Sequence, residues 1–145
     1  MLIHHSSHLF SQVRSAATLK EIKDLLRVTA NDYWHYHYRF DEPSSYRKKV
    51  LGEQMINNII INTIIPVVFA YGQIHKEQVF KNKAMQWLDE TTAEQNAITK
   101  KWELLEVANH SALDSQALTE LTKQYCLQKR CLQCAVGNAI LKRCQ

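Results

Sequence analysis

Four cysteines near the C-terminal end carry the clearest chemical signal in the sequence. Cys126, Cys131, Cys134 and Cys144 have the spacing C-x4-C-x2-C-x9-C. A C-x2-C pair can aim two thiolates at one metal ion, and a further cysteine nearby can supply a third. We therefore predict a metal site at Cys126, Cys131 and Cys134, with zinc or an iron–sulfur cluster as the candidate cofactor.

The backbone must leave its helical path before these three thiols can converge. At about 100° per residue, an unbroken helix would place Cys131 and Cys134 about 60° apart but Cys126 about 140° from Cys131. Metal binding therefore requires a break between about Leu127 and Arg130. Free structural thiols are the alternative interpretation, and a redox or disulfide role is the third.

Cys144 is predicted not to be a ligand. If residues 135–143 are helical, Cys144 lies roughly 15 Å from Cys134, whereas a ligand sulfur lies about 2.3 Å from its zinc ion. A site with three cysteines would then take its fourth ligand from a histidine, a carboxylate, water or another chain.

The cysteines lie in a basic segment. The net charge is +4, and residues 121–145 carry five basic residues and no acidic one, so that the other 120 residues sum to −1. Such a segment can contact an anionic partner such as nucleic acid, although a solvated helical face has the same composition. The candidate nucleic-acid-binding residues are Lys129, Arg130, Lys142 and Arg143.

Aromatic residues and histidines alternate within residues 32–40, a stretch that fits a strand or a turn. On a strand, His35 and His37 would face the same side, as a metal-binding pair requires. The rings around Arg39 could also stack on nucleic-acid bases. Such rings more often pack into gaps between helices, and we expect this anchoring role.

No catalytic residue is predicted. The sequence contains no recognisable Ser-His-Asp arrangement, no glycine-rich phosphate loop and no pair of carboxylates placed for acid–base chemistry. We therefore expect a helical accessory or interaction module, and the alternative is a nucleic-acid-binding module that assists a nuclease-like enzyme. A free-standing metalloenzyme has the least support.

Composition predicts the fold that positions these residues. The 145 residues fit one domain, and 46% hydrophobic residues with only three glycines and two prolines favour helices. We predict an all-α fold: a single-domain bundle of about six helices over residues 1–145, with the cysteine segment at its C-terminal end.

Local signals predict several helix boundaries. Thr18 and Glu21 have the pattern of a capping box, and Asp114 or Ser115 is the predicted N-cap of the helix that leads to the cysteines. A helix that starts near residue 52 is apolar almost all round and should form the core. Pro66 lies inside this helix and lacks a backbone donor, so we expect a kink or break there.

The same apolar stretch is interrupted by polar residues and falls short of the ~20 residues that a membrane span needs. Asn58 and Asn62 share a face with Pro66, and we expect them to satisfy backbone groups; a polar site inside the bundle is the alternative. We therefore expect no membrane contact. The N-terminal residues do not form a signal peptide, and we expect a cytoplasmic protein.

Several segments together resemble one bacterial family. They are residues 7–11, Asp32-Tyr33-Trp34, residues 37–40, Asn57-Asn58, residues 62–67, Phe69-Ala70-Tyr71-Gly72, residues 114–118, Tyr125-Cys126, residues 129–132 and residues 134–138. In these motifs the chain is similar to the C-terminal part of the domain of unknown function 2851 (DUF2851) family. The resemblance implies no activity, because the family has none assigned.

The resemblance does imply a longer protein. Family members carry a further region upstream, so Met1 is expected not to be a natural start, and a catalytic centre could lie in that region. Docking to it, or pairing of two copies through apolar surface that it leaves uncovered, is then expected for this chain. The family pattern includes Cys126, Cys131 and Cys134 but not reliably Cys144.

Overall fold

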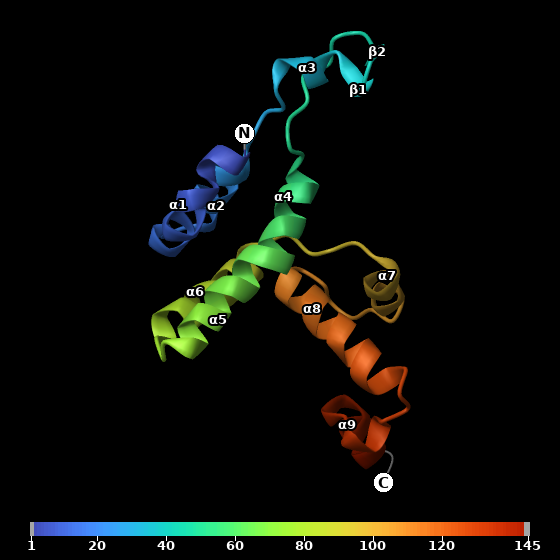
Figure 1. The fold of residues 1–145 in the computed structure, drawn as a ribbon. Helices are drawn as coiled ribbons and strands as arrows, with labels where there is room; N and C mark the ends of the chain where they lie inside the picture. Colours follow the sequence, from blue (N-terminus) through green and yellow to red (C-terminus); the bar gives the residue numbers. More distant parts are fainter. Residues whose placement is uncertain (1, 144–145) are drawn as a thin grey trace. The chain divides into compact units, whose positions relative to one another are not determined.

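The computed structural model describes residues 2–143, with the side chains of residues 8–142. The chain divides into two compact units, Met1–Leu88 and Asp89–Gln145, called unit 1 and unit 2 below. Both are mainly helical (Figure 1). The expected all-α bundle of about six helices is partly right: the described residues contain more helices than six and a two-stranded sheet. The single domain over residues 1–145 stays a prediction.

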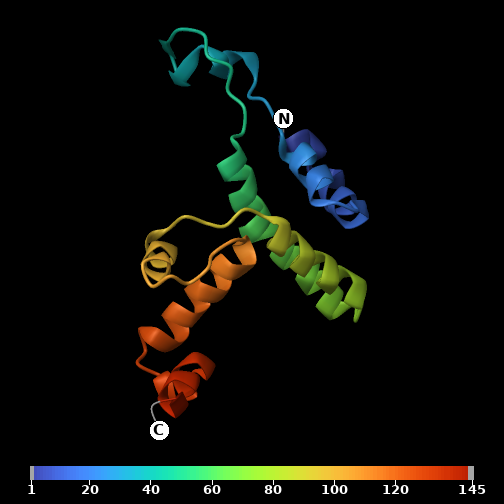
Figure 2. The same cartoon turned by 180° about the vertical axis from the view of Figure 1, so that it is seen from behind.

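Unit 1 combines a helical core with a small lobe between α2 and α4 (Figure 1 and Figure 2). Its elements are α1 (Leu2–Ser15), α2 (Leu19–Leu26), α3 (Asp32–His35), β1 (His37–Arg39), β2 (Glu42–Pro43), α4 (Glu53–Ile59), η1 (Ile60–Ile64), α5 (Ile65–Ile74) and α6 (Gln78–Glu90).

The core of unit 1 is formed by α1, α2, α6 and the long helix that α4, η1 and α5 make together. The helix α2 begins as predicted, because the Thr18 hydroxyl accepts the backbone N–H of Glu21 at 3.3 Å. The Glu21 carboxylate in turn accepts the N–H of Ala17 at 3.1 Å. The buried core residues are Val13, Ala16, Leu19, Ile22, Leu26, Ile56, Ile60, Ile64, Ile65, Val68, Ala84 and Trp87.

The long helix does not break at Pro66. It widens into the π-helical segment η1 just before the proline, and the N–H of Ile65 bonds to the carbonyl of Ile60, five residues earlier. A π-helical turn spreads the hydrogen bonds over five residues, so the helix can continue although Pro66 has no N–H to donate. The side-chain amide of Asn62 donates to the carbonyl of Asn58 at 2.9 Å, which confirms that an asparagine here satisfies a backbone group.

Length and composition alone would allow the 22-residue helix Glu53–Ile74 to cross a membrane. Within its most apolar stretch 39% of the residues are buried, and the core helix of a soluble protein meets the same test. Ile56, Ile60 and Val68 of this helix are almost completely buried. The predicted place of this helix in the core of unit 1 is therefore confirmed, whereas the expectation that the apolar stretch is too short for a membrane span is wrong.

Two contacts hold α6 against its neighbours. The ammonium group of Lys83 donates to the carbonyl oxygens of Arg14 and Ala16 at 3.0 and 2.8 Å, so a cation caps the C-terminal end of α1. Near the end of α5, Gly72 is buried, and a Cβ atom there would lie 2.9 Å from the carbonyl oxygen of Glu77. The backbones approach at Gly72 more closely than a side chain would permit.

Unit 2 contains the cysteine segment. Its elements are α7 (Ala97–Glu103), α8 (Ala112–Glu120), the π-helical η2 (Leu121–Cys126), the 3-10 helix η3 (Cys131–Gln133) and α9 (Ala135–Arg143). The N-cap of α8 is Ser111, so the predicted cap at Asp114 or Ser115 is wrong. Asp114 is the other half of a capping box, and its carboxylate accepts the N–H of Ser111 at 3.3 Å.

Candidate functional site

The helical path through unit 2 is interrupted directly after Cys126. The N–H of Lys129 bonds to the carbonyl of Cys126 at 3.1 Å, and the N–H of Arg130 bonds to that of Tyr125 at 2.9 Å. This pair of bonds is a Schellman motif, in which one residue adopts the left-handed conformation. Lys129 takes that position with φ of 55°. The break that the sequence analysis required between Leu127 and Arg130 is therefore present.

The break brings the three predicted cysteine ligands to one pocket of about 210 Å³. Cys126 ends η2, Cys131 begins η3 and Cys134 directly precedes α9. Cys134 is buried, whereas Cys126 and Cys131 are exposed. The remaining walls are aromatic, aliphatic or glycine: Trp102, Leu121, Tyr125, Val136, Gly137 and Ile140.

The side chains share this pocket without forming a ligand set. Across the part of the chain that the structure describes, no three histidine, cysteine or acidic side chains are grouped closely enough to hold a metal ion. Cys144 lies outside the described residues. Among the described residues the arrangement is thus a cysteine-lined apolar pocket without a metal-ligand set.

Three hydrogen bonds, two of them between backbone groups, position the cysteines. The N–H of Cys134 bonds to the carbonyl of Cys131 at 3.2 Å, and the N–H of Asn138 bonds to the carbonyl of Cys134 at 2.9 Å. The side-chain amide of Asn138 donates to the carbonyl of Leu132 at 2.8 Å. Gly137 lies against Cys131, since a Cβ at residue 137 would come within 3.0 Å of the Cys131 carbonyl oxygen.

The indole of Trp102 forms a wall of the pocket and is itself held in place. Its Nε1 donates to the hydroxyl of Thr122 at 2.7 Å, and that hydroxyl donates to the carbonyl of Leu118 at 2.8 Å. The spacing of the cysteines in the sequence was enough to predict that Cys126, Cys131 and Cys134 lie near one another. The contribution of Trp102 had no signal in the sequence, because it lies 24 residues before Cys126.

Two cations of the basic segment, Lys129 and Arg130, lie in the turn itself. Lys129, Arg130 and Lys142 are exposed, and the side chain of Arg143 lies outside the described residues. The Arg130 guanidinium lies 5.7 Å from the centre of the Tyr125 ring, and its Nε donates to the Gln133 side chain at 2.8 Å. Arg130 therefore stiffens the turn between Cys126 and Cys131.

The histidines of residues 32–40 do not form a metal pair. His35 is buried in α3, and its Nδ1 accepts the N–H of Lys49 at 3.1 Å. His37 stacks on Tyr33 at 4.0 Å, and its Nδ1 lies 2.8 Å from the Tyr33 carbonyl. The expectation that the aromatic rings pack into gaps between helices is also wrong for Tyr36, Tyr38 and Phe40, because at least half of each residue is exposed.

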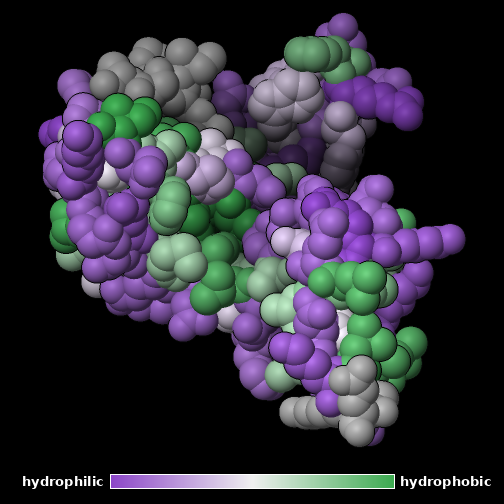
Figure 3. Space-filling view, turned by 90° about the horizontal axis from the view of Figure 1, so that it is seen from below, coloured by the Kyte–Doolittle hydropathy of each residue, from purple (hydrophilic) through white to green (hydrophobic). Residues whose placement is uncertain are grey.

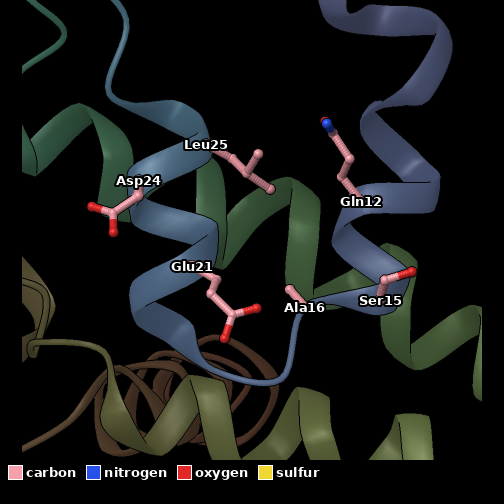
Figure 4. A pocket seen from close by; sticks show the side chains of 6 residues that line it. All are labelled: Gln12, Ser15, Ala16, Glu21, Asp24 and Leu25. Atoms are coloured by element: carbon pink, nitrogen blue, oxygen red, sulfur yellow. The ribbon is translucent and has the colours of Figure 1, made fainter.

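A second hollow, of about 520 Å³, lies between α1 and α2 (Figure 4). Gln12 and Leu25 extend into the space between the two helices, and the Asp24 carboxylate points away from it. Asp24 pairs with Arg27 at 2.8 Å, and the Glu21 carboxylate accepts the N–H of Ala17. Both carboxylates are thus engaged in local structure.

The comparisons with known proteins give a family and no closer relative. Neither the curated proteins nor the solved structures include a match to the chain. The model of one family, described as a protein of unknown function (DUF2851), matches residues 1–97. The cysteine segment lies beyond the matched residues, so its place in the family pattern stays a prediction. Since the match covers 97 of the 145 residues, the chain belongs to the DUF2851 family.

Proposed function

We propose that the chain is a helical interaction module whose unit 2 is stabilised by one zinc ion or iron–sulfur cluster bound to Cys126, Cys131 and Cys134. The observation that best supports this is the pocket of about 210 Å³ that all three cysteines line. Cysteines that serve only for packing behave as small apolar residues and are among the most buried. Cys126 and Cys131 are instead exposed at the pocket.

Binding requires two side chains to rotate toward a third. Cys134 is buried directly before α9, whereas Cys126 and Cys131 are exposed, and solvent leaves room for their side chains to rotate about χ1. The pocket is several times the roughly 30 Å³ that one water molecule occupies in the liquid. Three thiolates leave one position of a tetrahedral zinc site for water or for a ligand from a partner.

The metal would act on the fold rather than on a substrate. It would tie the end of η2 to the start of α9 across the turn at Lys129, and binding energy of this kind is also folding energy. In the cytoplasm, where we propose that the protein functions, thiols stay reduced and free to bind metal.

Elemental analysis and an absorption spectrum of anaerobically purified protein test this proposal. We expect about one equivalent of zinc, or iron with a visible absorption band. The variant Cys131→Ser should lose the metal, and Cys144→Ser is the matched control that should keep it. Folded protein that contains neither metal would contradict the proposal.

The interaction role is supported by apolar side chains at the surface of unit 2. Figure 3 shows several areas of apolar surface, in green, on this face of the molecule. The exposed apolar residues of this segment include Leu127, Leu132, Ile140 and Leu141. Contiguous exposed apolar surface commonly marks a protein interface. We expect a homodimer in light scattering, and a monomer at high concentration would contradict it.

Nucleic-acid binding through the basic segment is the second candidate. It is supported by the exposed cations Lys129, Arg130 and Lys142 and by the absence of acidic residues from residues 121–145; Arg143 is the fourth predicted contact. Binding of a labelled oligonucleotide should weaken steeply as salt increases, since phosphate contacts release counterions. No binding at low salt would remove this candidate.

A further inference from the structure

Residues 28–51 of unit 1 form a small lobe that folds on itself. Its two ends pair through an antiparallel bridge between Thr29 and Val50, and the N–H of Ala30 bonds to the carbonyl of Lys49 at 2.9 Å. Between them lie α3 and the hairpin of β1 and β2, drawn in cyan in Figure 1. We call residues 28–51 the aromatic lobe.

The aromatic lobe has its own internal framework. The Trp34 ring contacts Phe40 edge-on at 5.0 Å and Tyr33 at 5.1 Å. The buried His35 accepts the N–H of Lys49, and its carbonyl accepts the N–H of Arg47 at 2.8 Å. The positions of the outer rings therefore follow from packing and hydrogen bonds within the lobe.

The rings that this framework carries are exposed to an unusual degree. Phe40 has no polar group that would favour contact with water, yet 74% of it is exposed. The Tyr36 and Tyr46 rings lie 5.2 Å apart and are both at least half exposed. A cluster of exposed rings on a fixed framework is a surface that a ligand can cover. The exposed rings are Tyr36 (50%), Tyr38 (60%), Phe40 (74%) and Tyr46 (58%).

Cations are interleaved with these rings. The ammonium group of Lys49 lies 3.6 Å from the centre of the Tyr38 ring, and an Arg47 nitrogen donates to the Tyr38 hydroxyl at 3.4 Å. Residues 36–50 contain four cations and two carboxylates, and one of the carboxylates, that of Glu42, pairs with Arg39 at 3.8 Å. The cations are Arg39, Arg47, Lys48 and Lys49.

We infer that the aromatic lobe binds single-stranded nucleic acid, whose bases stack on the exposed rings while its phosphates contact the neighbouring cations. Unpaired bases present flat faces of the kind that exposed tyrosine and phenylalanine rings stack against, and proteins of this type place cations along the backbone. A hollow of about 480 Å³ adjoins Trp34 and Lys49 and could receive a further nucleotide. This site lies in unit 1 and depends neither on the metal nor on the basic segment.

A protein partner would use similar residues, because tyrosine and arginine are common at the centres of protein interfaces. The net positive charge around the rings favours the nucleic acid. A stacked, phosphate-contacting ligand has two measurable properties: binding weakens with salt, and it weakens when a ring is removed.

The test is fluorescence anisotropy of a labelled 15-nucleotide oligo(dT) with the full chain, at low and at physiological salt. We expect binding that weakens with salt, and a loss of about 10-fold or more in affinity for Tyr38→Ala and for Phe40→Ala. Phe40→Trp should retain affinity. Ile74→Ala is the matched control, since Ile74 is 75% exposed but lies outside the lobe, and its affinity should stay within about twofold of the wild type.

The wild-type chain gives a second measurement that does not depend on the folding of a variant. Oligo(dT) that contains 4-thiothymidine is crosslinked by light, and the attached peptides are identified by mass spectrometry. Crosslinks within residues 33–50 would support the inference. Absence of binding at low salt, or crosslinks confined to residues 121–145, would overturn it, as would affinity unchanged in Tyr38→Ala and Phe40→Ala.

Discussion

Gly137 offers a sharp test of how the cysteine segment is built, because two effects act in opposite directions there. Gly137 is the third residue of α9, and in an open helix position replacement of glycine by alanine stabilises by about 1 kcal/mol. Here the new Cβ would lie within 3.0 Å of the Cys131 carbonyl oxygen, which is backbone and cannot turn away. Overpacking of this kind costs about 1–3 kcal/mol.

Gly137→Ala should therefore destabilise unit 2 by a net value of up to about 2 kcal/mol, because the steric cost exceeds the helix preference. Urea denaturation followed by far-ultraviolet circular dichroism measures the change. Ala139→Gly is the control, since Ala139 is exposed in the same helix and should lose about 1 kcal/mol from helix preference alone. If Gly137→Ala stabilised the protein by about as much as Ala139→Gly destabilised it, the close approach to Cys131 would be refuted.

Three further substitutions test other features. Lys129→Gly should stabilise the turn after Cys126 by about 0.5–1 kcal/mol in urea denaturation, because glycine adopts the left-handed conformation with little strain. Lys83→Met should destabilise unit 1 by about 1–2 kcal/mol, because the carbonyls of Arg14 and Ala16 would lose their donor. Hydrogen bonds from the N–H of Ala17 and then from the Thr18 hydroxyl lower the pKa of Glu21 below its ordinary 4.5. The charged Glu21 carboxylate therefore stabilises the fold above pH 4.5, and this stabilisation is lost as the pH falls through the lowered pKa. Glu21→Gln should reduce this acid-induced loss in a pH series of melting temperatures.

Each of these substitutions has an outcome that would contradict it. A destabilised Lys129→Gly would mean that the lysine side chain makes a contact worth more than the backbone strain. An unchanged Lys83→Met would mean that water satisfies the α1 carbonyls equally well. A Glu21→Gln variant with the full acid sensitivity of the wild type would assign that sensitivity to other carboxylates.

The sequence predicted elements whose signals are local. Thr18 is the N-cap of α2 because its hydroxyl accepts the N–H of Glu21 in the first turn of the helix, and the Glu21 carboxylate accepts the N–H of Ala17 just before the cap. The core helix is predicted because it is apolar almost all round, and the break after Cys126 is required by the geometry of thiol convergence. These predictions depend only on residues close to one another in the chain, so they can be made from a single sequence.

The wrong predictions depend on contacts that a sequence does not display. Aspartate is a common N-cap residue, but Ser111 is the N-cap of α8, and Asp114 is its partner in the capping box. The rings near Phe40 were expected to fill gaps between helices, whereas they pack on one another around Trp34 and leave Phe40 exposed. The residue with left-handed backbone at the cysteine turn is Lys129. A glycine at this position would have predicted the turn from the sequence, because glycine is the usual residue there.

Replacement of glycine by alanine is a common way to make a protein more thermostable, because it restricts the unfolded chain. At Gly72 and Gly137 the same replacement is expected to destabilise the fold. In this protein both residues mark places where one stretch of backbone touches another, while chain reversal at Lys76 and Lys129 uses lysine with positive φ. A more stable variant of this protein should therefore carry glycine at the turns of Lys76 and Lys129 and keep Gly72 and Gly137 in the helices.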